Sequence, residues 1–453
     1  MSLGRRLLVA LLLVGLRPDA AAPSTCRAAE FSVADFADDD AADASVTPII
    51  FTPLDSTHEW PRVWNLGPTA TFQLRGRIDT DAIWSTQSAA NEATFGELGD
   101  VVGLRRARIG AEGALGAASR YVGEIDLASG SVVPRDVYVA FGSRSDGGES
   151  QWGHFREPFS LEGGTSARYF AFMERSPINL LDPARNWGAG LFRENLSGHT
   201  FAALGLFHAG TDTGDFQGGD GSTVGLTGRL TTAPVNEGDG ERLLHFGIAL
   251  SERVPENGVI IINQQPRSPL LELSDSSSSP FVPVINIPAE FQQLINLQFA
   301  AASGSLWTQS EWYGSLIDQT GGDTVFFHGV YVDGGYFLTG EHRDYDSSNG
   351  TLGAVRVRRP WLRLPSERDR PPGWGAWELA ARFSYLDFYD PDTPAGPSGP
   401  QMGIELPQST FGVNWYLSDR VRLMFNYSYA VPKQMTAGES AASIYATRLA
   451  VFW

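Results

Sequence analysis

The sequence predicts an all-β fold, a transmembrane antiparallel β-barrel of about sixteen strands, from three observations. From residue 70 onward, segments of roughly 10–14 residues alternate between apolar and polar side chains, whereas strands of soluble proteins usually run about 5–6 residues. Aromatic residues gather toward the ends of these segments, as in the interfacial girdles of membrane barrels. No segment reaches the roughly 20 consecutive apolar residues that a membrane-spanning helix needs. A soluble sandwich also alternates, but its strands are shorter.

The first 22 residues are expected to be a secretory signal peptide. Arg5 and Arg6 precede a short apolar core, residues 7–16, and Ala20, Ala21 and Ala22 supply a small-residue cleavage region. The chain is therefore expected to be exported. Its single cysteine, Cys26, leaves no disulfide within the chain.

Residues 23–66 are expected to form an acidic, flexible leader that precedes a barrel of residues 67–453. Residues 30–60 hold eight acidic residues and neither Lys nor Arg, and their apolar residues show no clear period. They contribute much of the formal net charge of −18. Because no basic face stands clear of neighbouring acids, no nucleic-acid partner is expected.

The strand pattern is cleanest in residues 421–431. Val421, Leu423 and Phe425 share one face, and Arg422 and Met424 share the other, so one face is apolar and one polar. Sixteen segments follow this pattern, and fourteen or eighteen strands remain open with shifted boundaries. The expected strands are 70–86, 104–115, 119–129, 134–143, 149–156, 186–195, 199–210, 223–232, 242–253, 293–303, 305–318, 325–340, 374–388, 404–417, 420–431 and 442–453. An even number suits antiparallel closure, and sixteen strands leave an aqueous channel.

If the apolar face meets lipid, the polar face meets a water-filled lumen. Alternation then points seven arginines inward: Arg75, Arg77, Arg106, Arg108, Arg382, Arg422 and Arg448. Guanidinium groups stay charged and bind oxyanions with two N–H groups, so these arginines could attract anions. They could equally balance inward acids such as Asp79 and Asp81. Arg105 shares a face with Ala107 and Ile109 and is expected at the rim.

Three connections, 157–185, 254–292 and 341–373, are too long for turns. The last holds seven arginines. No enzyme motif is found in these connections or elsewhere. The sequence contains neither G-x-S-x-G nor H-E-x-x-H, its seven histidines are scattered, and the glycines of residues 218–221 precede no helix. The sequence therefore predicts no catalytic site, no cofactor and no metal.

Four stretches resemble the phosphate-selective porins of the O and P type. They are LRRARIGAEGAL (104–115), GHFREPFSLEGGTSARYFAFMERS (153–176), GAWELAARFSYLDF (375–388) and STFGVNWYLSDRVRLMFNYSYA (409–430). The terminal Trp453 adds to this, because a closing strand that ends on an aromatic residue is typical of bacterial outer-membrane barrels. The resemblance implies a homotrimer in the outer membrane of a Gram-negative-type bacterium, with the third loop folded into the lumen.

The resemblance also assigns residues to a narrow anion path. The arginine pair falls on Arg105 and Arg106, the loop hydroxyl on Ser166, the arginine of the E-R pair on Arg175, and an aspartate on Asp136. Arg168 lies on the same loop. The chain departs from the family in having Ala167 in place of a second serine, the pair Gly163-Gly164, and no lysine before Lys433.

The expected function is passive diffusion of solutes with a preference for anions, phosphate or polyphosphate among them, set by arginines of the lumen. Arg105, Arg106, Arg108, Ser166, Arg168 and Arg175 would form the constriction, and Arg75, Arg77, Asp136, Arg382 and Arg422 the lumen wall. Small anions such as phosphate and the lipid of the outer membrane are the expected partners. A general porin without charge preference and a structural or adhesive surface barrel are the alternatives. Gly163-Gly164 are expected to bend the third loop away from the wall.

Overall fold

The computed structural model describes residues 52–53, 63–195, 199–210, 223–262, 280–364, 367–393, 403–434 and 438–453. All of them belong to one compact unit, Ile49–Trp453. The expected signal peptide and most of the expected leader lie outside the described residues. The described part of the chain has no helix that is both long and apolar enough to cross a bilayer.

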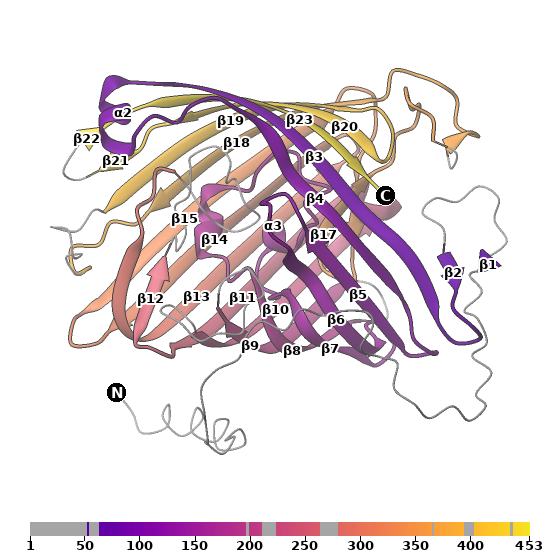
Figure 1. Ribbon diagram of the computed structural model, residues 1–453, viewed down its shortest axis with the longest axis horizontal. Coiled ribbons are helices and arrows are strands. Elements are labelled where there is room, and N and C mark those ends of the chain that lie inside the picture. Colours follow the sequence, from indigo (N-terminus) through magenta and orange to yellow (C-terminus); the bar gives the residue numbers. More distant parts are fainter. Residues whose placement is uncertain are drawn as a thin grey trace, which may run out of the picture. The chain divides into compact units, whose positions relative to one another are not determined.

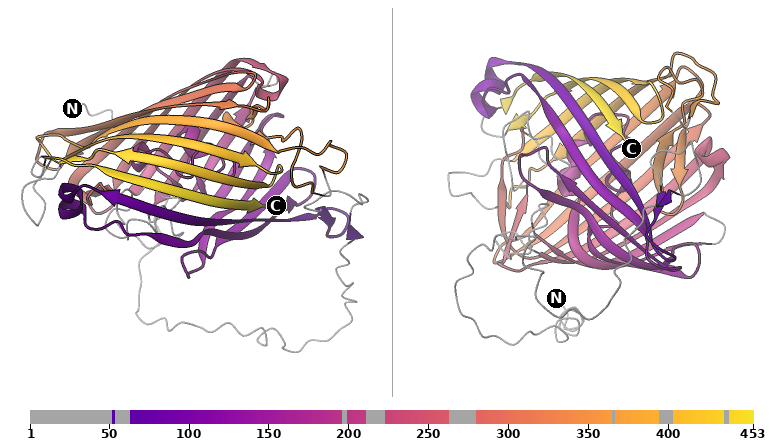
Figure 2. Two further views of the ribbon diagram at one scale, coloured as in Figure 1. Left: turned by 90° about the horizontal axis from the view of Figure 1, so that it is seen from above. Right: turned by 45° about the vertical axis from the view of Figure 1, so that its right-hand side comes forward.

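Sixteen antiparallel strands close into a barrel, as predicted (Figures 1 and 2). The last strand of the ring pairs with the first, from Ala442 opposite Gln87 to Phe452 opposite Arg77. In ring order the strands are β3 (Thr71–Gln87), β4 (Val101–Ala114), β5 (Ser119–Asp126), β6 (Val133–Ser143), β7 (Gly148–Arg156), β8 (Arg185–Glu194), β9 (Thr200–Ala209), β10 (Thr223–Glu237), β11 (Arg242–Pro255), β13 (Ile285–Ser303), β14 (Leu306–Gln319), β15 (Thr324–Phe337), β18 (Ala376–Asp387), β19 (Ile404–Tyr416), β20 (Val421–Ala430) and β23 (Ala442–Phe452). Each of them overlaps one expected segment.

Alternation of burial along the strands explains why the segments pair in this way. In β20, Arg422 and Met424 are 1–2% exposed, whereas Leu423 and Phe425 are 39% and 52% exposed. The exposed apolar face turns outward, where lipid takes the place of water. The buried face turns into the barrel, where polar and aromatic side chains meet one another.

The predicted start of the ordered chain at residue 67 is a few residues too late. The short strand β2 (Val63–Asn65) pairs with β3, and β1 (Thr52–Pro53) pairs with β2. Trp64 also packs on Phe72, with ring centroids 5.6 Å apart. This aromatic contact extends the sheet into the segment that composition alone predicts to be a flexible leader.

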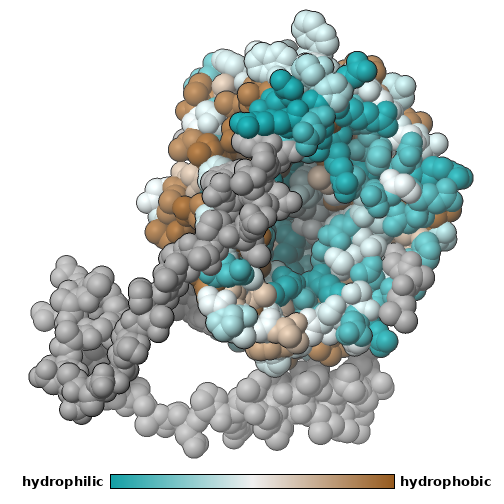
Figure 3. Space-filling view, turned by 90° about the vertical axis from the view of Figure 1, so that its right-hand side faces the viewer, coloured by the Kyte–Doolittle hydropathy of each residue, from teal (hydrophilic) through white to brown (hydrophobic). Residues whose placement is uncertain are grey.

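The two ends of the barrel differ. At one end, which we call the short-turn end, the strands are joined mostly by short turns such as those after β4, β6, β13 and β19. This end also carries β2 and the C-terminus and lies at the right of Figure 1. Figure 3 looks onto it and shows a recess lined by hydrophilic residues. The opposite, long-loop end carries α2 (Ala89–Phe95), β12 (Val259–Ile262), β21 (Lys433–Gln434) and β22 (Gly438–Glu439).

The connection between β7 and β8, residues 157–184, is here called the inner loop. It contains the short helix α3 (Leu161–Gly164) and a 3-10 helix, Pro177–Leu181. Its backbone contacts inward-facing side chains of distant strands: Arg422 donates to Phe170 O (2.6 Å), Arg448 to Met173 O (2.5 Å), Arg382 to Glu174 O (3.0 Å) and Asn414 to Ala171 O (2.7 Å). These contacts place the inner loop inside the ring of strands, where α3 is seen in Figure 1.

One buried carboxylate holds the start of the inner loop. Glu311 on β14 accepts hydrogen bonds from the backbone N–H groups of Leu161 (2.7 Å) and Glu162 (2.8 Å) and from the Tyr331 hydroxyl (2.7 Å). The chain leaves the wall before α3, so the interpretation of Gly163-Gly164 as the bend is wrong. They end α3 instead, and a Cβ on Gly163 would lie 2.2 Å from an Asp182 carboxylate oxygen.

A second segment enters the barrel from the short-turn end. The connection after β15 forms a hairpin of β16 (Arg343–Asp346) and β17 (Thr351–Val355). Arg229 on β10 donates to the carbonyls of Asn349 and Gly350, both at 2.7 Å. Arg343 of the hairpin donates to Tyr169 O of the inner loop, so the two inserted segments touch. An adhesive barrel would display this connection as a domain on its surface. The hairpin instead lies inside the barrel, which argues against that alternative.

A side chain at Gly76 on β3 is expected to destabilise the barrel. A Cβ there would lie 2.3 Å and 2.5 Å from ring atoms of Trp453, which pairs with Gly76 through two backbone hydrogen bonds of 3.0 and 3.1 Å. Gly76→Val should destabilise the barrel by about 1–3 kcal/mol through overpacking and lower its unfolding temperature on heat-modifiability gels. Gly123→Val on β5 is the control, because a Cβ there meets nothing within 4 Å. Equal unfolding temperatures for both variants would contradict the role of this contact.

Glu311→Ala is expected to loosen the start of the inner loop. Each buried N–H group left without its acceptor costs about 1–3 kcal/mol, so amide hydrogen exchange in peptides covering residues 157–164 should accelerate. Glu252→Ala is the control, because Glu252 is exposed on β11 and accepts only from Gln293 among the described residues. Unchanged exchange in Glu311→Ala would show that the loop is held without this carboxylate.

Candidate functional site

A cavity of about 190 Å³ lies between the inner loop and strands β3 to β8. It has room for several water molecules or a partly hydrated small anion. We call it the arginine cavity, because half of its lining residues are arginines. It is lined by Arg75, Arg77, Arg108, Glu124, Asp136, Arg156, Gly163, Gly164, Thr165, Ser166, Ala167, Arg168, Arg175 and Arg185.

The strand side of the arginine cavity comes from β3 and β4. Arg75, Arg77 and Arg108 point inward because they follow the two-residue period of their strands. Each has a carboxylate partner: Arg75 donates to Glu112 (2.8 Å) and Glu124 (3.1 Å), Arg77 to Asp79 (2.8 Å) and Arg108 to Asp126 (2.8 Å). Alternation identifies these three arginines correctly.

The loop side comes from residues 163–175. Arg168 lies 3.8 Å from a Glu124 oxygen, beyond hydrogen-bond reach. Arg175 has its guanidinium 4.6 Å from the Phe170 ring centroid and donates at 3.3 Å to Gly163 O. The Ser166 hydroxyl oxygen accepts a long hydrogen bond from the Arg168 N–H (3.4 Å). Ring faces contact both loop arginines, since the Arg168 guanidinium also lies 5.9 Å from the Phe452 ring centroid.

Two arginines of the cavity are not identified by the sequence pattern. Arg156 ends β7 and donates to Asp182 (2.8 Å), and Arg185 starts β8 and donates to Asp136 (3.1 and 3.2 Å). Neighbouring Phe155 and Asn186 are the buried inward residues at these positions, so strict alternation would turn both arginines outward. The two-residue period ends where the chain leaves the wall and where it rejoins it. The only sequence feature that could have pointed to these two arginines is their position beside a long connection.

Arginines outnumber carboxylates around the cavity. Its lining holds seven arginines and two carboxylates. The lining arginines also pair with carboxylates behind the lining, and two of those are shared with further arginines: Asp79 with Arg106 and Arg448, and Asp126 with Arg135. Because guanidinium groups stay protonated, the local excess of charge is positive.

Arg105 is not at the rim, so the expectation from alternation is wrong. Pairing of β3 with β4 runs from Asp79 opposite Arg106 directly to Thr80 opposite Leu104. Arg105 is therefore the extra residue of a β-bulge, which re-aims its side chain into the barrel. It donates two hydrogen bonds of 2.9 Å to Glu174 of the inner loop.

Arg106 lies beside Arg105 and also faces the inner loop rather than the arginine cavity. It donates to Asp79 at 3.0 Å and lies 3.7 Å from Glu174. Burial alone would raise the pKa of the Glu174 carboxyl, but Arg105, Arg106 and Arg448 together hold that pKa below its ordinary value. Glu174 thus remains a charged partner of the arginine pair.

Arg382 on β18 and Arg422 on β20 are buried and contact the inner loop from strands outside the cavity lining. Arg382 pairs with Asp333 (2.7 Å) and with Glu162, and lies 4.4 Å from the Phe172 ring centroid. Arg422 donates to Phe170 O. Neither lines the arginine cavity. Their contacts fix the position of the loop, and with it the positions of Arg168 and Arg175.

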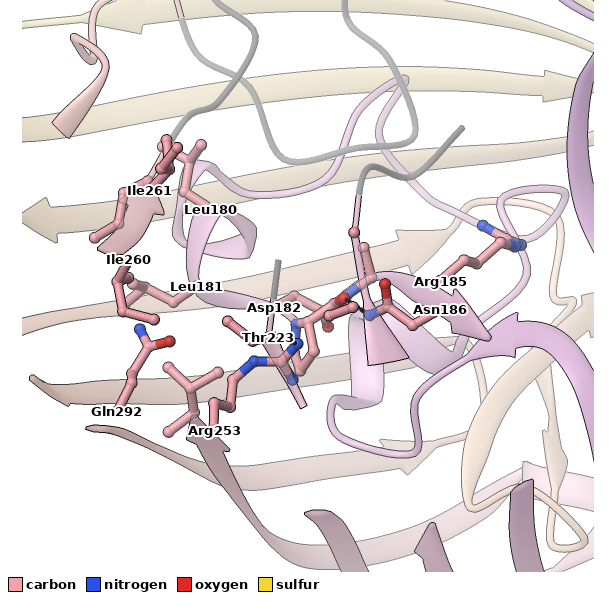
Figure 4. A pocket seen from close by; sticks show the side chains of 16 residues that line it. Leu180, Leu181, Asp182, Arg185, Asn186, Thr223, Arg253, Ile260, Ile261 and Gln292 are labelled. Atoms are coloured by element: carbon pink, nitrogen blue, oxygen red, sulfur yellow. Dashed lines mark hydrogen bonds between the residues drawn. The ribbon is translucent and has the colours of Figure 1, made fainter. Parts of the chain in front are cut away.

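A second cavity of about 140 Å³ lies near the end of the inner loop (Figure 4). Leu181 and Ile260 line one part, and Arg253 stands beside Thr223 in another. Arg253 already donates to Glu157 (3.2 Å) and to Thr223 (3.0 Å). Among the described residues no group of three His, Cys, Asp or Glu side chains is arranged to hold a metal ion.

Comparison with known proteins identifies the family of the chain. Residues 72–449 match the family of phosphate-selective porins O and P. The chain is 24% identical to Porin O of Pseudomonas aeruginosa over 318 residues, which cover 66% of this chain and 69% of that protein. It is 27% identical over 366 residues, 79% of this chain and 68% of the relative, to an uncharacterised protein of Caulobacter vibrioides.

Solved porin structures share the fold. The anion-selective porin from Comamonas acidovorans has a TM-score of 0.52 at 12% identity, with 85% of this chain and 100% of that chain covered. The OmpT variant of Vibrio cholerae that lacks loop L8 has a TM-score of 0.51 at 11% identity, with the same coverage of both chains. The family match extends over most of the barrel, and the chain therefore belongs to the phosphate-selective porin O and P family and forms a porin channel of the outer membrane.

Proposed function

We propose that this porin conducts small anions in preference to cations and that phosphate is among them. The observation that supports the proposal is the arginine cavity, whose lining holds seven arginines and two carboxylates. The excess positive charge would attract an anion electrostatically. Rings or rows of charged side chains are known to set the ion selectivity of pores. The family to which the chain belongs is described as phosphate-selective.

The proposed mechanism is passive. Arg168 and Arg175 project from the inner loop, and Arg108 faces them from β4. Their N–H groups would replace part of the hydration shell of an oxyanion as it passes, since planar guanidinium groups match oxyanion geometry. The neighbouring carboxylates Glu124 and Asp136 also line the cavity. They would keep binding weak enough for release, as conduction requires. No catalytic step and no cofactor form part of the proposal.

A general porin with little charge preference is the second candidate. It is favoured by the pairing of Arg75, Arg77 and Arg108 with carboxylates at 2.8 Å. In that case, the arginines would serve mainly to balance acids on the wall. The homotrimer implied by the family resemblance remains part of both proposals.

The reversal potential of the channel distinguishes the two candidates. In a planar bilayer with a KCl gradient, an excess of positive charge along the path should move the reversal potential toward the chloride equilibrium potential. The purified full chain is the sample, and the sign and size of the potential are the measurement. A potential near zero would favour the general porin, and a shift toward the potassium equilibrium potential would sink the anion proposal.

Arg175→Ala is expected to weaken the block of chloride current by phosphate. Loss of one charge-assisted hydrogen bond, about 1.5 kcal/mol, corresponds to roughly a tenfold rise in the blocking concentration. Arg242→Ala is the matched control, because Arg242 is 65% exposed at the start of β11 and pairs with Glu237. Arg175→Lys keeps the charge but loses the planar donor pair and should give an intermediate block. An unchanged block in Arg175→Ala would remove Arg175 from the anion path.

A further inference from the structure

The segment that leads from β17 to β18 returns over the outer surface of the barrel. Trp374 O accepts hydrogen bonds from the indole N–H groups of Trp377 on β18 (3.2 Å) and Trp415 on β19 (2.7 Å). The Trp361 ring packs 5.6 Å from that of Trp415, and Trp377 stacks on Trp415 at 5.1 Å and 15°. Gly375 has φ +75°, and a Cβ there would lie 2.3 Å from Tyr416 O, so glycine permits this approach.

These tryptophans lie at the edge of the lipid-facing surface. Trp377 shares the outward face of β18 with Leu379 and Phe383, and Trp415 shares that of β19 with Phe411. Both are near the short-turn end of their strands, one residue from the start of β18 and one from the end of β19. Trp361 and Trp374 are 54% and 79% exposed. Two large aromatic side chains so exposed on a connecting segment suit the headgroup level of a membrane better than bulk water.

Exposed arginines accompany the tryptophans. Arg358, Arg359, Arg363 and Arg368 are exposed, and none of the described carboxylates lies within ion-pairing distance of them. Other arginines of the same segment are paired: Arg356 lies 2.9 Å from Asp344, and Arg370 lies 2.7 Å from Asp419. The segment therefore combines an apolar surface with positive charge that its own acids do not neutralise.

We propose that this surface, the basic tryptophan patch of Trp361, Trp374, Trp377, Trp415, Arg358, Arg359 and Arg363, binds the headgroup of an anionic phospholipid. In outer-membrane barrels the short turns face the periplasm, so the lipid belongs to the inner leaflet. Its phosphate would accept hydrogen bonds from the arginines, and the tryptophans would pack on the glycerol and upper acyl region. A general aromatic girdle accounts for the tryptophans but not for the three neighbouring arginines.

Native mass spectrometry of the delipidated, detergent-solubilised full chain tests the proposal. Phosphatidylglycerol and phosphatidylcholine are titrated separately, and the ratio of their apparent affinities is measured. The wild type should prefer phosphatidylglycerol. The triple variant Arg358→Gln/Arg359→Gln/Arg363→Gln should lose that preference by roughly a factor of five for each arginine. Arg356→Gln is the matched control and should keep the preference, because Arg356 is paired with Asp344.

Equal affinities for the two lipids in the wild type, or a preference retained in the triple variant, would overturn the proposal. Displacement of phosphatidylglycerol by an equal concentration of inorganic phosphate would overturn the assignment to lipid. The KCl conductance of the triple variant should stay at the wild-type value and shows that the barrel is folded. Since the patch lies outside the pore, its failure and a failure of the anion proposal are separate results.

Discussion

The demand of buried guanidinium groups for acceptors organises the interior of this barrel. A charged arginine removed from water is costly unless each N–H group meets an acceptor. Carboxylates on neighbouring strands supply many of them, as Asp81 does for Arg448 through two contacts of 2.7 Å. Backbone carbonyls of the inner loop supply others, and the loop is thereby held against the wall. The lining of the arginine cavity holds fewer carboxylates than arginines, and the proposed anion path rests on this excess.

Two groups of arginines inside the barrel therefore have different roles: strand arginines that hold the inner loop, and arginines on the loop itself that line the cavity. Arg382 and Arg422 reach loop atoms that lie more than 200 residues away in sequence. Arg168 and Arg175 lie on the loop that those contacts hold in place. The position of the proposed anion path therefore depends on arginines that do not line it. Removing Arg422 would disturb the path through the loop, by a route different from the direct loss of Arg175.

The sequence predicts the wall well because lipid outside and water inside impose a two-residue period on every strand. It predicts the inward position of Arg75, Arg77 and Arg108 for the same reason. It does not predict the loop-to-wall contacts, since nothing local links Phe170 to Arg422. The period also carries no information at strand ends, where Arg156 and Arg185 were missed. The hairpin of β16 and β17 shows a further limit, because composition cannot tell whether a long connection is displayed or folded inward.

Because of the bulge in β4, the number of residues in this strand decides how many arginines reach the inner loop. Leu104 and Ala107 both belong to the outward face, and two residues rather than one separate them. A chain one residue shorter at this point would keep every other side chain of β4 on its present face. If the missing residue were Arg105, the strand would lose one of the three guanidinium groups that meet Glu174. Deletion of Arg105 alone would thus remove one positive charge that faces the inner loop and leave the rest of the strand in register.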